Sequence, residues 1–363
     1  MIYYLVTPGF EHTIKNYLAF WAKELEPRFK IVFYNDLLRA RDLPLGTYIF
    51  SDLERLLPAE TEIATQVWEQ LNAAGAKLLN HPKRTLKRYD LLTMLYAKGT
   101  NQFRAVRASD KTTPLKFPVF LREEGEHSGN LTVLLQNRHQ VDEALVGAVF
   151  RKHQLSTLLL VEYLDTKDAN GVFRKFSSFV VGGRVVPCHV DCSRGWVVKD
   201  TDIVDESIMA QELNYVRTNP HREWLEETFR LAGAEYGRID YSLLGDKPQV
   251  WEINTNPVVI LTPDHYQEIH MPVKRTFAEH IGPAFEAIDT LAGVEKMVPI
   301  RVEAALLARL DREQNEQRKL QARRQLMKTV THWPAVQAIR KVVRPLMTPF
   351  APLLARRSRG RSS

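Results

Sequence analysis

Acidic and amide side chains gather on one face of a predicted β-hairpin in residues 238–257. Two runs of alternating polar and apolar residues flank a short segment centred on Asp246, a pattern typical of antiparallel strands joined by a tight loop. With the loop centred there, Asp240 lies directly opposite Glu252. Asn254 points to the same face, two residues further along its strand. The sequence therefore predicts two opposed carboxylates with a carboxamide beside them.

This arrangement of side chains suits a divalent cation. Two carboxylates opposite each other on a ladder repel and destabilise the pair, and a cation removes that penalty. An all-oxygen donor set is typical of Mg²⁺ or Mn²⁺, completed by water and substrate phosphates. The alternative is the polar outer face of an ordinary hairpin. The same alternation assigns further residues to the polar face, namely Arg238, Ser242 and Asn256, and others to an apolar face, namely Ile239, Tyr241, Leu243, Trp251 and Ile253.

The order of these residues also resembles a known family. Asp240 followed, after a hairpin turn, by Glu252-Ile-Asn254-Thr-Asn-Pro resembles the metal-binding hairpin of the ATP-grasp superfamily. The likeness is to its glutathione synthetase-like and ribosomal-protein glutamate ligase-like enzymes in particular. It implies that Asp240, Glu252 and Asn254 hold Mg²⁺ or Mn²⁺ ions that bridge the phosphates of ATP. The resemblance covers residues 82–290, more than half of the chain.

Two arginines stand where the resemblance implies contacts with ATP phosphates. We expect a helix over residues 81–99, entered at a proline that fits a first turn. A cation near the start of this helix would touch phosphate, and Arg88 is nearest to that role, with Lys87 as the alternative. On their own, such cations are also typical of a solvated helix face. The second arginine, Arg122, ends a buried-type strand where the superfamily usually has lysine, and its planar fork can still grip phosphate.

The loop after Arg122 departs from the superfamily pattern. Backbone N–H groups of a loop rich in small residues can cradle phosphate oxygens. Here the loop has only two glycines, and it carries Glu124 and Glu126, which repel a triphosphate.

The apolar strand expected over residues 157–165 turns polar at its end. It resembles the hinge between the two ATP-grasp lobes, where backbone groups read the adenine edge and an acidic residue binds the ribose. The resemblance implies an adenine segment of Glu162, Tyr163 and Leu164, with Asp165 or, alternatively, Asp168 on the ribose.

A second hairpin, with a Gly-Gly turn, is predicted over residues 173–190. Phosphoryl transfer relies on positioned positive charge, and the superfamily uses cations here for the γ-phosphate or an acyl phosphate. The candidate catalytic cations are Arg174, Lys175 and Lys199, the last preferred to Arg194. The alternative is that Arg174 pairs with Asp191 across the ladder.

The composition indicates a soluble globular protein with an uneven distribution of charge. Of 363 residues, 44% are hydrophobic and 26% charged. The beginning lacks a basic leader, and no run approaches the roughly 18 apolar residues of a membrane span. The two cysteines are too far apart along one strand to form a disulfide. We therefore expect a cytoplasmic protein. Residues 301–363 carry 15 Lys or Arg and 4 Asp or Glu, whereas the other 300 residues carry 35 and 39.

We therefore predict an α/β protein with an ATP-grasp fold in three parts. Residues 1–80 form a small α/β unit with a mainly parallel sheet. Residues 81–292 form the ATP-grasp domain of two α+β lobes, with a hinge near residues 162–168. Residues 293–363 form a basic helical tail with a disordered end. This tail either packs on the body or contacts an anionic membrane surface or a partner protein, with Trp333 and Phe350 among its apolar residues.

The resemblance implies an ATP- and Mg²⁺-dependent ligase that joins a carboxylate to an amine through an acyl phosphate. The substrates would be small molecules or peptides, and no specific nucleic acid is indicated. A small-molecule kinase is the second hypothesis. The third is a nucleotide-binding module whose basic tail contacts a partner or a membrane.

Overall fold

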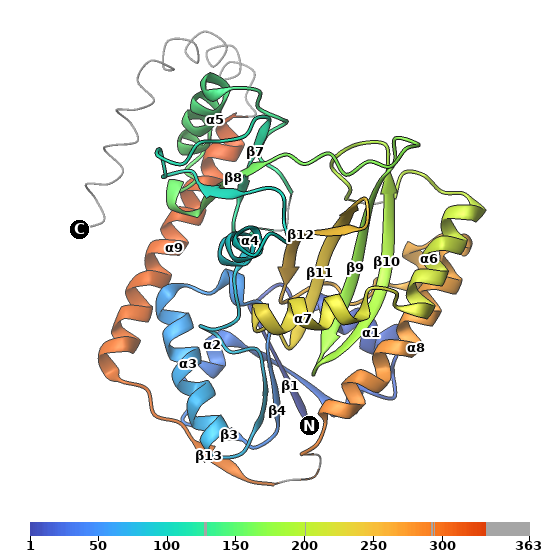
Figure 1. The fold of residues 1–363 in the computed structure, drawn as a ribbon. Coiled ribbons are helices and arrows are strands. Elements are labelled where there is room, and N and C mark those ends of the chain that lie inside the picture. Colours follow the sequence, from blue (N-terminus) through green and yellow to red (C-terminus); the bar gives the residue numbers. More distant parts are fainter. Residues whose placement is uncertain (127–128, 200, 292, 294, 332–363) are drawn as a thin grey trace. The chain divides into compact units, whose positions relative to one another are not determined.

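The computed structural model describes residues 1–126, 129–199, 201–291, 293 and 295–331 (Figure 1). Both helices and strands occur throughout these residues, which confirms the predicted mixed class. The chain divides into two compact units. The first joins Met1–Asn101 to Asp165–Ala308, and the second joins Gln102–Leu164 to the described residues from Arg309 to Thr331. The boundary after Leu164 falls within the predicted hinge.

A four-stranded parallel sheet forms the beginning of the first unit. Its strands are β1 (Ile2–Val6), β2 (Phe29–Phe33), β4 (Thr47–Phe50) and β5 (Lys77–Leu79), in the order β2-β1-β4-β5. Its helices are α1 (His12–Phe20), α2 (Tyr34–Leu37) and α3 (Pro58–Ala73). Every residue of β1 is buried, as expected for a strand covered on both faces. The mainly parallel sheet expected in residues 1–80 is present, and it belongs to the same compact unit as residues 165–308.

A four-stranded antiparallel sheet follows in the same unit. It consists of β9 (Phe173–Val181), β10 (Arg184–Ser193), β11 (Tyr236–Leu244) and β12 (Lys247–Asn254), in the order β10-β9-β11-β12. Both predicted hairpins are confirmed. Gly182 and Gly183 have φ values of 57° and 88°, which is the backbone that a tight two-residue turn between twisted strands requires.

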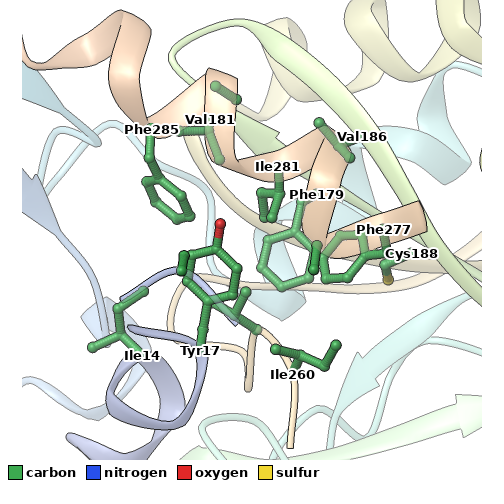
Figure 2. Packing of buried hydrophobic residues seen from close by; sticks show 14 of the residues in the cluster. Ile14, Tyr17, Phe179, Val181, Val186, Cys188, Ile260, Phe277, Ile281 and Phe285 are labelled. Carbon is green, nitrogen blue, oxygen red and sulfur yellow. The ribbon is translucent and has the colours of Figure 1, made fainter. Parts of the chain in front are cut away.

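Helices cover both faces of this sheet. The helices α6 (Glu206–Thr218) and α8 (Met271–Ile288) pack against one face, where Phe179 and Val186 meet Phe277 and Ile281 of α8 (Figure 2). The helices α7 (Arg222–Ala232) and α4 (Arg88–Ala97) pack against the other face. Because side chains alternate along a strand, each of β9 and β11 contributes to both cores.

The second unit contains a smaller antiparallel sheet. Its strands are β6 (Ala105–Arg107), β7 (Val119–Glu123) and β8 (Leu158–Glu162), in the order β6-β8-β7. The helix α5 (Arg138–Phe150) begins at Asn137, whose side-chain oxygen accepts a hydrogen bond from the Gln140 backbone N–H at 3.1 Å and so caps the first turn. The apolar core joins β7 and β8 to α5 through Leu121, Leu160 and Val141.

The remaining elements are short, apart from one long helix. The strands β3 (Asp42–Pro44) and β13 (Met297–Pro299) pair antiparallel, and the 3₁₀ turns are η1 (Glu26–Arg28), η2 (Leu53–Arg55), η3 (Leu155–Thr157), η4 (Pro263–His265) and η5 (Glu268–His270). The helix α9 (Ala304–Thr331) is the polar helix expected at the start of the basic tail. No helix in the described part of the chain is long and apolar enough to cross a membrane. Trp333 and Phe350 lie outside the described residues, so the tail contact stays a prediction.

The helix predicted over residues 81–99 begins later than expected, at Arg88. The preceding segment is held by other partners. The Leu86 backbone N–H donates to the Ala232 carbonyl at 2.8 Å, and the Thr85 hydroxyl donates to the Gly233 carbonyl at 2.8 Å. Residues 82–85 form a turn, in which the Thr85 N–H also donates to the His81 carbonyl at 3.0 Å. This turn is tied to the end of α7, and α4 begins only after it.

The side chain of Asn80 connects the parallel sheet to the start of β11 through hydrogen bonds. It is fully buried, with a left-handed φ of 63°, a region that asparagine tolerates better than most residues. Its amide nitrogen donates to the carbonyls of Phe50 at 3.1 Å and Tyr236 at 2.8 Å. Its oxygen accepts from the backbone N–H groups of Glu235 at 2.8 Å and Tyr236 at 3.0 Å. The side chain thus satisfies four backbone groups between elements far apart in sequence.

Replacement of Asn80 by Asp should lower the free energy of unfolding by about 3 kcal/mol, because two buried carbonyls then face an acceptor instead of a donor. Urea unfolding monitored by circular dichroism measures this difference. Asn72→Asp, at an exposed position on α3, is the matched control and should change stability by about 0.5 kcal/mol or less. Equal unfolding curves for the two variants would contradict this connecting role.

Candidate functional site

Asp240 and Glu252 lie opposite each other in the β11–β12 ladder, as the sequence predicts. Arg238 lies opposite Asn254 in the next same-face position. The two carboxylates and the carboxamide of the predicted metal set are therefore brought together on one face of the hairpin.

The pairing is reached in an unexpected way. Nearer the turn, Ser242 pairs with Gln249 and Tyr241 with Val250, and the register then shifts by one residue before Asp240. The turn therefore has two central residues, Gly245 and Asp246, and is shorter than predicted. Trp251 is an extra residue in β12 and forms a β-bulge. This bulge restores the predicted opposition of Asp240 and Glu252. The placement of Trp251 on the apolar face was wrong. Its indole N–H donates to the Ser242 hydroxyl at 2.8 Å, and Val250 packs in the apolar core instead.

The sheet extends this pair into a polar row across four strands. His189 on β10 pairs with Ser177 on β9, Ser177 pairs with Asp240 on β11, and Asp240 pairs with Glu252 on β12. The β9–β10 ladder has its own register shift between Pro187 and His189. Bulges therefore flank this row in both hairpins, and bulges are frequent next to active sites because they redirect side chains.

Asp240 is buried in the middle of this polar row, with 5% of its surface exposed. Its Oδ1 accepts hydrogen bonds from the Arg238 Nε at 2.9 Å and the Ser177 hydroxyl at 2.9 Å. Burial by itself would raise the pKa of Asp240, but the positive charges of Arg238 and Lys175 outweigh burial and hold this pKa below its ordinary value. Asp240 is therefore an anion throughout the physiological range.

Glu252 forms an ion pair with Arg88, the first residue of α4. Arg88 is only 4% exposed. A buried arginine at the positive end of a helix requires an anion nearby, and Glu252 supplies one. The two opposed carboxylates are thus each balanced by an arginine. The expectation that a metal ion alone relieves their repulsion is corrected by these two pairs.

The side chain of Asn254 is fixed by the backbone that directly follows β12. Its side-chain oxygen accepts from the backbone N–H of Asn256 at 2.8 Å. The Asn256 oxygen in turn accepts from the hydroxyls of Tyr4 at 2.6 Å and Thr13 at 2.7 Å. This chain of contacts connects the predicted metal set to β1 and α1.

The donor set fits a hard divalent cation in its chemistry, with carboxylate and carboxamide oxygens on one face. A cation there would share Asp240 and Glu252 with their arginines or displace them. Within the described residues there is no group of three His, Cys, Asp or Glu side chains that could hold a metal ion, so any such ion would need the carboxamide, water or substrate oxygens.

The predicted catalytic cations have different surroundings. Lys175 contacts Asp191 at 3.0 Å directly across the ladder. Arg174 instead forms an ion pair with Asp168, so the alternative pairing of Arg174 with Asp191 is wrong. The register explains both contacts, because it places Lys175 opposite Asp191.

Asp168 and Lys199 contact the two other predicted catalytic cations, Arg174 and Lys175. The hydrogen bond from Arg174 is the main cause that lowers the pKa of Asp168, and the Val172 backbone N–H also donates to its carboxylate, at 2.9 Å. Lys199 has an exposed side chain, and its carbonyl accepts from the Lys175 ammonium at 3.4 Å. Of the three predicted catalytic cations, Lys175 is the one whose charge helps to lower the pKa of Asp240 in the polar row.

Sequence reasoning placed Arg238 on the polar face of the hairpin but gave it no role, and it did not place Ser177 and His189 beside Asp240. His189 lies 3.5 Å from Asp191, and burial lowers its pKa to about 3, so its imidazole stays neutral. Ser177 and His189 reach the site only because β9 pairs with β11.

The second unit carries Arg122, Glu162, Tyr163 and Leu164, whereas Asp165 begins the return to the first unit. Glu162 is buried, and its carboxylate accepts from the Arg104 side chain at 2.6 Å and the Lys116 backbone N–H at 2.8 Å. The Tyr163 N–H donates to the Pro118 carbonyl at 2.9 Å. These contacts fix the backbone of the predicted adenine segment.

Arg122 lies on β7 opposite Leu159. In the following loop, Glu124 forms an ion pair with Arg107, which offsets part of the negative charge expected to repel a triphosphate. Asp165 contacts the Lys167 ammonium at 2.8 Å on the surface of the first unit.

No family model matches the sequence, and no curated protein matches it. Among solved structures, the chain is similar to D-alanine–D-alanine ligase from Bacillus anthracis, with 11% identity and a TM-score of 0.45 over 79% of this chain and 95% of that chain. It is also similar to an ATP-grasp RimK domain protein from Sphaerobacter thermophilus, with 12% identity and a TM-score of 0.43 over 77% and 98%. The ATP-grasp ligase PsnB gives 11% identity and a TM-score of 0.44 over 79% and 95%. The last two of these neighbours are described as ATP-grasp proteins.

Proposed function

We propose that this protein is an ATP- and Mg²⁺-dependent ligase that joins a carboxylate to an amine. The observation that carries the proposal is the polar row across β10, β9, β11 and β12, in which Asp240 and Glu252 face each other with Asn254 beside them. A row of fixed, mostly buried oxygen donors bordered by arginine and lysine suits phosphate–metal chemistry better than it suits a sheet surface.

In this proposal Asp240, Glu252 and Asn254 hold the metal ions. Bound there, Mg²⁺ would neutralise charge on the β- and γ-phosphates of ATP. Arg238 donates hydrogen bonds to Asp240, and its remaining N–H groups would serve charge that develops beside the carboxylates. Ser177 orients Asp240 by donating to it.

The remaining nucleotide contacts are also proposals. Arg88 and Arg122 would contact the phosphates, and the fixed backbone of Glu162, Tyr163 and Leu164 would receive the adenine. Asp165 would bind the ribose. Arg88 already forms an ion pair with Glu252. Its contact with phosphate therefore requires that Glu252 and the phosphate share this arginine.

The reaction proceeds in two balanced steps. A carboxylate oxygen of the first substrate attacks the γ-phosphorus, and ADP leaves. The amine of the second substrate then attacks the acyl carbon, phosphate leaves with the electron pair of the C–O bond, and the amine nitrogen loses a proton. Arg174, Lys175 and Lys199 would stabilise the acyl phosphate, whose charge exceeds that of the free acid.

The first test separates this ligase from a kinase that acts on a hydroxyl group. Pools of amino acids, dicarboxylates and small peptides are incubated with ATP, Mg²⁺ and hydroxylamine. The ligase should convert one carboxylate to a hydroxamate with release of one phosphate per product. Asp246→Asn, in the exposed hairpin turn, should behave like the wild type. A phosphorylated product that accumulates without free phosphate and without an amine requirement would contradict the proposal.

A further inference from the structure

A recess on the first unit lies between the end of α1 and the length of α8, and its lining includes no residue of the polar row. It encloses about 390 Å³, within the size range of small-molecule sites. Tyr17, Trp21 and Glu24 line one side, and Glu279, Gly282 and Glu286 line the other. Nothing in the proposed ligase reaction uses these residues, so the recess needs an explanation of its own.

Tyr17 supplies the first argument. The residue has 0% of its surface exposed, and its hydroxyl has no hydrogen-bond partner among the described residues. Figure 2 shows this hydroxyl directed toward α8, near Ile281 and Phe285. A Cβ added at Gly282 would lie 3.4 Å from the hydroxyl oxygen, so Gly282 lies directly beside it. Burial of an unsatisfied hydroxyl is unfavourable, and a ligand in the recess would satisfy it.

The charge of the lining supplies the second argument. Four exposed charged residues line the recess: the carboxylates of Glu24, Glu279 and Glu286, and the guanidinium of Arg275. None of the three carboxylates has an ion-pair partner within the part of the chain that the structure describes. Burial, with the charges of Glu24 and Glu286, raises the pKa of Tyr17, so the hydroxyl stays neutral and its oxygen can accept a hydrogen bond.

Trp21 forms a fixed wall of this recess. Its indole N–H donates to the Leu261 carbonyl at 2.8 Å, which holds the ring in place without using its face. Indole faces attract ammonium and guanidinium groups, and the apolar ring also suits a hydrocarbon chain. The recess thus combines an excess of negative charge, a buried hydrogen-bond acceptor and an aromatic wall.

We propose that this recess binds an organic cation, a primary ammonium group on a short hydrocarbon chain. The ammonium donates to the Tyr17 hydroxyl oxygen and is neutralised by the glutamates, and the hydrocarbon chain lies against Trp21. The site is separate from the polar row and does not depend on the proposed ligase activity.

Isothermal titration of the full chain with 1,5-diaminopentane tests the proposal, with pentane-1,5-dioate as the charge-reversed probe. The wild type should bind the diamine and not the dicarboxylate. Tyr17→Phe and Glu279→Gln should each weaken diamine binding by about tenfold or more, as expected for loss of a hydrogen bond or charge facing an ammonium. Tyr17→Phe should unfold at the same or a higher temperature without ligand, because it removes an unsatisfied buried hydroxyl.

Two control variants locate the site. Glu26→Gln removes an exposed carboxylate close to the recess but outside its lining and should bind the diamine like the wild type. Glu252→Gln, in the polar row, should also leave diamine binding unchanged. Absence of diamine binding by the wild type would overturn the proposal. It would equally be overturned if binding were lost in Glu252→Gln and retained in Tyr17→Phe, since the amine would then occupy the polar row.

Discussion

Replacement of Asp240 by Asn should lower the free energy of unfolding by about 3 kcal/mol at neutral pH. The change leaves Arg238 largely buried without its carboxylate, and an uncompensated buried charge is strongly destabilising. Urea unfolding of wild type and variant at pH 7 measures the difference. Asp246→Asn, in the exposed turn of the same hairpin, should leave stability within about 0.5 kcal/mol of the wild type.

The pH dependence of this difference has a definite sign. The pKa of Asp240 is lower in the folded protein than its ordinary value, so its contribution is fully present above the unfolded pKa of about 4 and is lost as the pH falls further. The gap between wild type and Asp240→Asn should therefore be constant from pH 7 to pH 5 and shrink below about pH 4.

A double variant separates the ion pair from other causes. Asp240→Asn combined with Arg238→Met removes both charges and should recover part of the lost stability. If the double variant is less stable than Asp240→Asn, the loss comes from packing or from Ser177 and not from the unpaired arginine.

The second large effect concerns the metal and the nucleotide. In the wild type, Mg²⁺ together with ATP should raise the melting temperature by more than the sum of the separate shifts, because both bind the folded state and each improves the site for the other. Glu252→Gln and Asn254→Ala should abolish this excess shift and lower phosphate release in the ligase assay by about a hundredfold or more.

The excess shift is calculated from melting temperatures of one and the same variant, with and without each ligand. A variant with a lower melting temperature without ligand can therefore still be compared with the wild type. This matters for Glu252→Gln, which also removes the partner of Arg88 and lowers the baseline melting temperature. Asp246→Asn should keep the full excess shift. Retention of the whole effect in both site variants would place the metal ions on other residues.

Local patterns in the sequence were enough to predict both hairpins and the pairing of Asp240 with Glu252 in the candidate site. Alternation with period two and a glycine turn constrain residues that are close along the chain, so the opposition of Asp240 to Glu252 follows from counting. Even there the count succeeded only because the bulge at Trp251 compensated for a shorter turn. A bulge depends on packing against the rest of the sheet, which an alternating pattern does not encode.

The sequence by itself thus determined that Asp240, Glu252 and Asn254 share the polar face of the β11–β12 hairpin, but not the bulge that turns Trp251 toward Ser242. The tertiary structure alone decided what surrounds them. Ser177 and His189 join Asp240 because β9 lies beside β11, and the order of strands in a sheet is set by long-range packing. Arg88 reaches Glu252 because contacts with the end of α7 delay the start of α4 until that residue. Ser177 and Asp240 are 63 positions apart and Arg88 and Glu252 are 164 apart, and no local periodicity specifies such contacts.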